Sequence, residues 1–257
     1  MKVISHILGD HKEIVILPLA DLHLGDIHSD YKKIVEWLDY VKNTPNAYAI
    51  LNGDLMDAAT RYSIGDVYGQ NLKPMQQLEQ CVKLFEPIKK KILAVLPGNH
   101  ELRIYKQDGI DTTLMMCNQL GIADRYSPES AVVFARFGKH NTHRHGAMVC
   151  YSIYCVHGSG GGRTEGAKIN RLTQLASIVD CDIYIHSHSH LPAVTKLCFY
   201  RLHPNNHSVN KVDKLFVNTS AFLEYGGYGE LASYKPSCTD TPRIILNGSK
   251  RDMKAIL

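Results

Sequence analysis

The chain has 257 residues, of which 44% are hydrophobic and 21% charged, the composition of an ordinary globular protein with a full core. Its formal charge of +4 comes from 29 basic and 25 acidic residues spread along the sequence, which excludes a basic tail for nucleic acid. No segment approaches the ~18 apolar residues of a membrane span, and the first residues do not form a signal peptide. We therefore expect a single domain, residues 1–257, that is cytoplasmic and makes no membrane contact.

The seven cysteines are an odd number, form no C-x-x-C pair and have no regular spacing. Several lie inside apolar runs such as CYSIYC at 150–155, where a reduced cysteine behaves as a small buried hydrophobe. We expect neither a disulfide framework nor a cysteine-based zinc site.

Five short apolar runs each end on polar residues capable of chemistry. They are IVILPLADLH at 14–23, YAILNGD at 48–54, ILAVLPGNHE at 92–101, YSIYCVHG at 151–158 and DIYIHSHSH at 182–190. Runs of this kind predict strands buried on both faces. Helical spacing between them predicts helices near 30–41, 74–90, 111–120 and 167–179, the first capped by Ser29 or Asp30. Alternating strands and helices indicate an α/β fold, in which ligands gather at the carboxyl ends of the strands.

Beyond residue 190 the pattern changes to strand-like runs without a clear helix between them. These are LCFYRLH at 197–203, KLFVNTSAFLEY at 214–225 and PRIILNG at 242–248. They predict either an extension of the core or a second sheet. The histidine-rich segment KHNTHRH at 139–145 lies between two strand-like runs, and we interpret it as an exposed hairpin loop rather than a second metal cluster.

The polar ends of the five runs together offer carboxylates, imidazoles and a carboxamide. Their chemistry-bearing residues are Asp21, His23, Asp54, Asp57, Asn99, His100, His157, His188 and His190. Such a mixed nitrogen and oxygen set suits Mn²⁺, Fe or Zn²⁺. In an extended chain, alternate side chains share a face, so the D-x-H and H-x-H spacings each predict two side chains pointing the same way. By the same rule His186 would point with His188 and His190.

The blocks ADLHLGD, NGDLMD, PGNHE, VHG and HSHSH resemble, in order and spacing, those of the calcineurin-like metallophosphoesterases across residues 21–190. The resemblance implies a four-layer α/β/β/α sandwich that holds two divalent metal ions. We expect Mn²⁺, with Fe, Zn²⁺, Ni²⁺ or Mg²⁺ as alternatives. It also implies ligands for one ion at Asp21, His23 and His190, ligands for the other at Asn99, His157 and His188, and a bridging carboxylate at Asp54.

The resemblance further implies a metal-bridging hydroxide as nucleophile and catalytic roles for His100 and Asp57. His100 would act as the general acid, and Asp57 would orient it. The alternative for Asp57 is a helix N-cap. The chain has Ser187 where the family usually has glycine before H-x-H.

Three further residues are candidates for substrate binding: Arg103, Arg163 and His186. His186 matches no ligand of the family, so we favour a rim or outer-shell histidine over a third metal contact. Arg163 lies in the glycine-rich segment HGSGGGRTEG at 157–166, which is either a mobile phosphate-binding loop or a plain flexible turn. Arg103 is either a phosphate contact or a solvated residue at the start of a helix.

The residues around Asp57 and His100 indicate which class of phosphoester the protein acts on. The Arg-Gly that follows G-D-x-x-D in the superfamily's protein phosphatases is missing after Asp57, and His100 stands where enzymes of lipid-linked diphosphosugars carry arginine. The blocks are closest to DNA-repair nuclease cores and to bacterial and phage phosphodiesterases. We therefore predict a phosphodiesterase acting on a phosphoester substrate, with a DNA or RNA nuclease as the first alternative. An inactive scaffold on the same fold is the second, disfavoured because all seven ligands are present. The sequence does not predict an oligomeric state.

Overall fold

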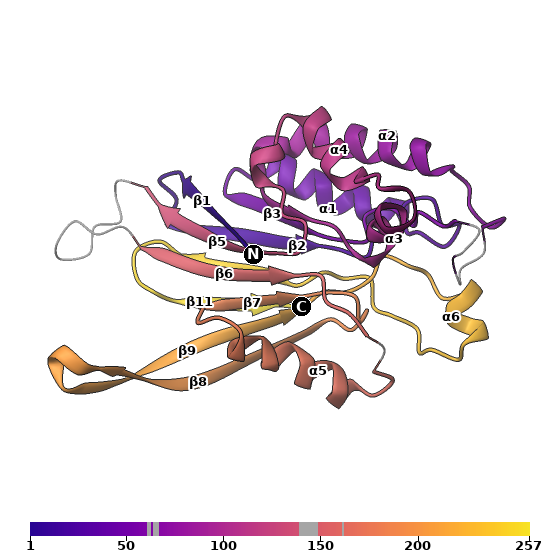
Figure 1. The fold of residues 1–257 in the computed structure, drawn as a ribbon. Coiled ribbons are helices and arrows are strands. Elements are labelled where there is room, and N and C mark those ends of the chain that lie inside the picture. Colours follow the sequence, from indigo (N-terminus) through magenta and orange to yellow (C-terminus); the bar gives the residue numbers. More distant parts are fainter. Residues whose placement is uncertain (61–62, 64–66, 139–148, 161) are drawn as a thin grey trace.

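A computed structural model describes residues 1–60, 63, 67–138, 149–160 and 162–257. Two sheets stack face to face, with helices α1 to α4 outside one sheet and α5 outside the other (Figure 1). The expected α/β/β/α sandwich is therefore confirmed. The helices are α1 Tyr31–Asn43, α2 Pro74–Phe85, α3 Asn99–Asp108, α4 Thr112–Leu120, α5 Glu165–Gln174 and α6 Gly227–Leu231, and short 3₁₀ segments cover Glu86–Lys91, Ala123–Arg125, Leu175–Ser177 and Pro204–Asn206.

The six-stranded sheet has the order β1-β5-β6-β7-β9-β8 and the five-stranded sheet the order β11-β10-β2-β3-β4. Bounds in the first sheet are β1 Lys2–Leu8, β5 Ser130–Phe137, β6 Cys150–Val156, β7 Ile183–His186, β9 Ser208–Asn218 and β8 Ala193–His203. In the second they are β11 Met253–Ile256, β10 Arg243–Asn247, β2 Glu13–Leu19, β3 Ala47–Asn52 and β4 Ile92–Leu96. Strands β2, β3 and β4 are mutually parallel, as are β6, β7 and β9, so each set of following loops lies at one sheet edge.

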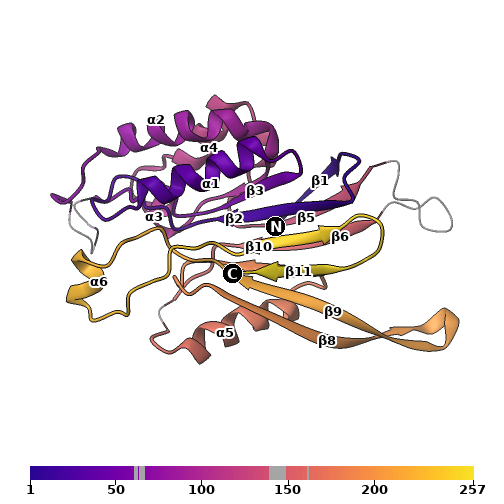
Figure 2. The ribbon, with the colours of Figure 1, turned by 180° about the vertical axis from the view of Figure 1, so that it is seen from behind.

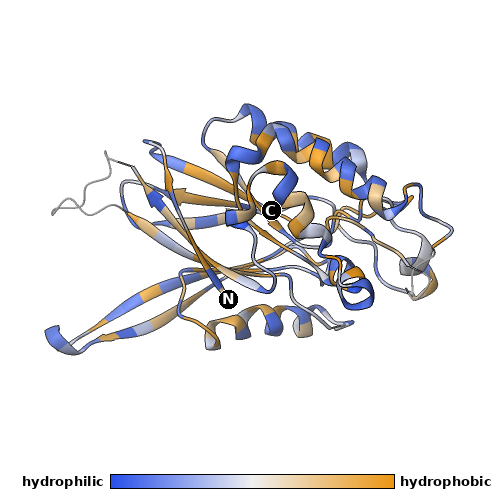
Figure 3. Ribbon diagram, turned by 45° about the horizontal axis from the view of Figure 1, so that its top comes forward, coloured by the Kyte–Doolittle hydropathy of each residue, from blue (hydrophilic) through white to orange (hydrophobic). Residues whose placement is uncertain are grey.

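The core has a layer between the sheets and one layer under each set of helices. Ile16, Ile50 and Ile153 belong to the cluster between the sheets and are fully buried. Asp30 caps α1 by accepting a hydrogen bond from the Lys33 amide, and helical spacing places Ile34, Leu38 and Val41 on the buried face of this helix. At about 1.5–3 kcal/mol for each large aliphatic side chain removed from water, these layers supply the main driving force for folding. In Figure 3 the helices accordingly carry hydrophobic residues toward the sheets and hydrophilic residues outward.

Several elements differ from the sequence prediction. The C-terminal runs divide between the sheets, β8 and β9 joining the first and β10 and β11 the second (Figure 2). The run expected to be extended over 214–225 leaves the sheet at Asn218, and the strand β1 was not predicted. The expected hairpin loop at 139–145 lies outside the described residues. Within the described residues, no helix is both long and apolar enough to cross a membrane.

Candidate metal centre

The loops at the carboxyl ends of the strands bring the predicted ligands together in two adjacent sets. In one set, ligand atoms of Asp21, His23 and His190 all lie within 4.8 Å of one another. In the other, the same holds for Asp54, His157 and His188. The Oδ1 atom of Asn99 lies 3.2 Å from His157 Nε2 and so adds a carboxamide to the second set.

Asp54 also connects the two sets. It forms a third group within 4.8 Å with His23 of the first set and with His100. Its Oδ2 atom lies 3.2 Å from His157 Nε2 and 4.0 Å from His100 Nε2. One carboxylate therefore lies where it could contact both cations, as a bridge between two like charges requires.

The direction of the ligand side chains is set by left-handed backbone conformations and not by the alternation of side chains along a strand. Strands β2 and β7 end at Leu19 and His186, before the D-x-H and H-x-H residues begin. Five ligand candidates instead have positive φ: Asp21 (53°), His23 (46°), Asp54 (49°), His188 (65°) and His190 (53°). Such values are uncommon outside glycine and gather at functional sites, where the surrounding fold enforces them. The expectation that an extended chain aligns these pairs is wrong.

The hydrogen bonds of two imidazoles fit metal binding. His23 has Nδ1 3.3 Å from Asp57 Oδ1, while its Nε2 is buried without a hydrogen-bond partner among the described residues. His157 donates from Nδ1 to the Asn52 carbonyl at 2.8 Å, which leaves its Nε2 toward Asp54. A metal-ligating histidine typically donates its other ring N–H to a carboxylate or carbonyl. The donor set thus fits two divalent cations.

Glu101, which the sequence analysis did not single out, holds the loop that carries Asp54. Its buried carboxylate accepts backbone N–H groups from Asp54 at 3.0 Å, Leu55 at 2.6 Å, Met56 at 2.9 Å and Gly98 at 2.8 Å. Four amides on one carboxylate bind the loop after β3 to the start of α3. The only sequence signal for this role is that an acidic residue follows Asn99 and His100.

The charges of the centre perturb one another strongly. Burial alone would raise the pKa of the Asp54 carboxyl, but the imidazoles of His157, His100 and His23 hold it well below its usual range. Burial would likewise lower the pKa of His157, yet the carboxylates of Asp54 and Asp21 raise it to about 10. Burial and the neighbouring His157 lower the pKa of His188 to about 4. The carboxylates of Asp54 and Asp21 thus favour a proton on the His157 ring, and a cation that binds this ring must displace that proton.

His100 and Asp57 form a pair beside the two ligand sets. His100 Nδ1 lies 2.6 Å from the Asp57 carbonyl and 3.2 Å from its carboxylate, so the proton is on Nδ1 and Nε2 faces Asp54. Burial would lower the pKa of His100, but the carboxylates of Asp57 and Asp54 raise it to about 9. Asp57 caps none of the described helices; α2 has its N-cap at Lys73. The helix-cap alternative for Asp57 is therefore wrong.

The structure places the three candidate substrate-binding residues differently. Arg103 lies one turn after His100 on α3 and donates from Nη1 to Ser63 Oγ at 2.7 Å. The Arg163 guanidinium lies 5.5 Å from the ring centroid of Tyr234. Residue 161 of its glycine-rich loop is outside the described residues.

His186, the last residue of β7, is 3% exposed, and its Nδ1 lies 2.8 Å from Asn218 Oδ1. It shares a face of the strand with Tyr184, which packs with Leu172 and Leu175 under α5. Since Asn218 donates to Ser189 and Leu191, His186 helps to hold the loop that carries His188 and His190. The expectation that all three histidines project from one strand face is wrong.

Residues after 192 also hold candidate ligands in place. The sequence did not predict this role for the C-terminal segment. The Phe222 amide donates to the Asp21 carbonyl at 2.9 Å, and Ser237 Oγ donates to the His190 carbonyl at 3.2 Å. The segment between them includes α6, which lies at the same end of the molecule as α3 (Figure 1). The C-terminal part of the chain thus braces the first ligand set.

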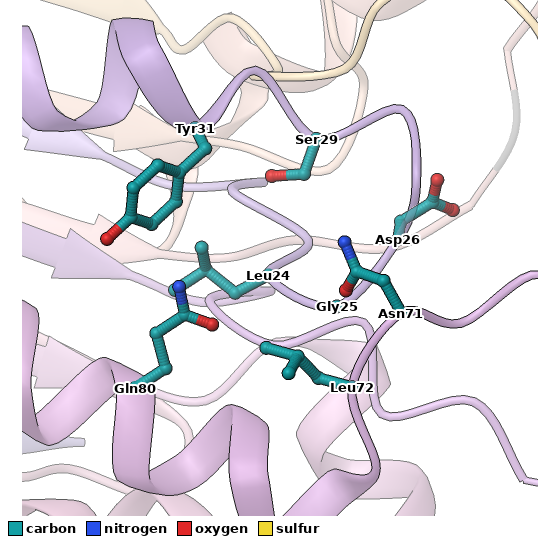
Figure 4. Close-up of a pocket in the computed structure, with 8 residues that line it drawn as sticks. All are labelled: Leu24, Gly25, Asp26, Ser29, Tyr31, Asn71, Leu72 and Gln80. Carbon is teal, nitrogen blue, oxygen red and sulfur yellow. The ribbon is translucent and has the colours of Figure 1, made fainter.

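Two surface hollows lie near these loops. One, of about 340 Å³, is lined by residues that include Leu24, Tyr31 and Gln80, shown in Figure 4. The other, of about 400 Å³, lies on the α5 side and includes His186 and Arg171. None of the seven ligand candidates lines either hollow.

A family model described as calcineurin-like phosphoesterase matches residues 22–192. No curated protein matches the chain in sequence. Among solved structures, a predicted phosphoesterase from Streptococcus pneumoniae is 15% identical with a TM-score of 0.39, covering 95% of this chain and 89% of its own. A single and a double mutant of Vps29 from Entamoeba histolytica are 11% and 10% identical, with TM-scores of 0.44 and 0.40, each covering 95% of this chain and 98% of its own.

Proposed function

The chain belongs to the calcineurin-like phosphoesterase family and is thus a phosphoric ester hydrolase, and we propose that it cleaves phosphodiesters at a centre for two divalent cations. The observation that carries this proposal is the pair of ligand sets joined by Asp54, with His100 beside them. A lone metal site would not need a shared carboxylate. We propose Mn²⁺ as the native cation, because oxygen and imidazole donors are mixed.

When bound, two cations would polarise the phosphoryl group and supply a nucleophile from water near neutral pH. Asp21, His23 and His190 would hold one cation, Asn99, His157 and His188 the other, and Asp54 both.

The remaining catalytic work falls to His100. Its Nδ1 is held by Asp57, and its Nε2 faces the centre. Since the carbonyl and the carboxylate of Asp57 accept from Nδ1, Nε2 is the ring nitrogen from which His100 can donate a proton to the leaving-group oxygen. The guanidinium of Arg103, one helical turn away on α3, adds positive charge close enough to act on His100.

The preference for diesters rests on the sequence. No Arg-Gly follows Asp57, and His100 replaces the arginine of the diphosphosugar enzymes. All seven cysteines are free, as is usual in a reducing compartment, and we keep the cytoplasm as the proposed location. Nucleic acid remains a candidate substrate, and the assay below separates it from small diesters.

Hydrolysis of bis-p-nitrophenyl phosphate and of p-nitrophenyl phosphate with added Mn²⁺ tests the proposal. We expect faster turnover of the diester, and His100→Ala should retain metal while losing about 10²–10⁴-fold in turnover, the usual contribution of a general acid. A panel of single-stranded DNA, double-stranded DNA, RNA and cyclic nucleotides then identifies the substrate class. Absence of turnover on every substrate, with metal shown to be bound, would contradict the proposal and favour a scaffold.

A further inference from the structure

Gln77 is a fully buried polar residue inside the hydrophobic layer under α1 and α2. Its exposed fraction is 0%, and it lies on the face of α2 that also carries Leu78 and Cys81. An amide buried in this way costs folding free energy unless each of its polar atoms finds a partner. Its partners therefore indicate why a polar side chain is kept there.

The hydrogen bonds of Gln77 define a chain with one possible direction. The Ala58 backbone N–H can only donate, and it donates to Gln77 Oε1 at 2.9 Å. Gln77 Nε2 must then be the donor to Gln70 Oε1, at 2.6 Å, and to the Leu72 carbonyl, at 2.9 Å. Gln70 in turn presents its Nε2 to Asp57 Oδ2 at 2.5 Å. Neither amide can be flipped without placing donor against donor.

The Asp57 carboxylate has two contacts with imidazoles, both through the same oxygen, and the contact with Gln70 is its third. Its Oδ1 lies 3.3 Å from His23 Nδ1 and 3.2 Å from His100 Nδ1. The torsion that turns a carboxylate about its terminal bond is soft, so these contacts alone do not fix the plane of the carboxylate. The bond from Gln70 to Oδ2 keeps Oδ1 between the two rings.

The backbone around the two glutamines is shaped to accommodate them. A side chain at Gly25 would collide with the Gln77 amide, and the φ of Gly25 is +106°. The Asn71 amide donates to the Gly25 carbonyl at 2.9 Å, and Asp26 forms a β-bridge with Gln70. The segment after His23 is thereby joined to the segment that carries Gln70.

We propose that Gln77 and Gln70 are positioning residues that, through Asp57, hold His23 and His100 with Nε2 toward the metal centre. This inference rests on the proposed function for the role of His100 as acid. The two glutamines are not among the ligand candidates, and they act by fixing the plane of the Asp57 carboxylate that faces the imidazoles. The metal ligand and the acid thus share one oriented carboxylate oxygen, which acts beside the 2.6 Å hydrogen bond from His100 Nδ1 to the Asp57 carbonyl.

The variants Gln70→Met and Gln77→Met, and the two combined, test this relay because methionine keeps the length of the side chain and removes the amide. Gln80→Met is the matched control: the same change on the same helix, in the hollow of Figure 4 and outside the relay. The substrates are methyl 4-nitrophenyl phosphate and methyl phenyl phosphate, which differ in how much the leaving group needs a proton.

In each relay variant we expect kcat on the phenyl diester to fall about 10-fold or more, the usual effect of removing an outer-shell partner, and to fall less on the nitrophenyl diester. The double variant should lose about as much as a single one, because the glutamines act as one unit. Equal losses on both diesters, or losses matched by Gln80→Met, would overturn the relay.

A second measurement does not depend on turnover. In metal-free protein labelled with ¹⁵N-histidine, the Nδ1–H signals of His23 and His100 should shift in Gln70→Met and Gln77→Met and stay unchanged in Gln80→Met. Unchanged signals in the relay variants would overturn the relay whatever the activity. If the wild-type protein hydrolyses neither these diesters nor any substrate of the panel above, the proposed function fails, and these spectra alone decide the relay.

Discussion

Replacing Glu101 by glutamine should loosen the loop that carries Asp54. The substitution keeps the size of the side chain but turns one acceptor oxygen into an NH₂ group. Oε1 accepts from Leu55 and Met56, and Oε2 accepts from Asp54 and Gly98. Whichever way the new amide lies, two buried backbone N–H groups lose their acceptor.

The expected loss of unfolding free energy follows from the two backbone N–H groups that lose their acceptor. A buried donor left unsatisfied costs about 1–3 kcal/mol, so two cost about 2–6 kcal/mol of unfolding free energy. Since domains are stable by only about 5–15 kcal/mol, a loss of this size is large. Metal affinity should fall at the same time by about 10–100-fold, because Asp54 would no longer be held in its left-handed conformation.

Urea unfolding of the metal-free protein and metal titration of the folded protein measure the two effects. Glu79→Gln, on the exposed side of α2, is the control for the chemical change itself. We expect the urea midpoint to fall in Glu101→Gln and to stay within error in the control. A loss below about 1 kcal/mol together with unchanged metal affinity would refute the idea that Glu101 holds the Asp54 loop.

Three other substitutions or conditions probe the same centre. Asp54→Ala should abolish metal binding and turnover together, and a variant that keeps full turnover would exclude Asp54 as the bridge. Gly98→Ala should prevent formation of the centre because its Cβ would collide with Asp54, and wild-type metal content by elemental analysis would contradict this. Because the pKa of His157 is raised to about 10, metal must displace a proton there, so affinity should rise with pH by about tenfold per unit below pH 10. Calorimetry at pH 7 in buffers of different ionisation enthalpy should detect at least one proton released per Asp54-His157 site, and no release would refute the assignment.

The sequence alone was sufficient for the fold class, and it named as candidate ligands residues that the structure brings together. Short apolar runs, each ending on a polar block, predict parallel strands whose loops converge at one edge, because parallel strands share the direction of their carboxyl ends. The residue types needed for two cations are local properties of those blocks. Asp21, His23 and Asp54 could therefore be named without coordinates.

Only the tertiary structure decided how these residues are aimed. Positive φ at Asp21 and His188 is imposed by packing across loops far apart in sequence, and no local pattern announces it. The same reason hides Glu101, three of whose four amide partners lie in the loop after β3. It also hides Gln77, which reaches His100 through two intermediate side chains. Composition and spacing are properties of the chain, whereas direction depends on hydrogen bonds between segments that meet only after folding.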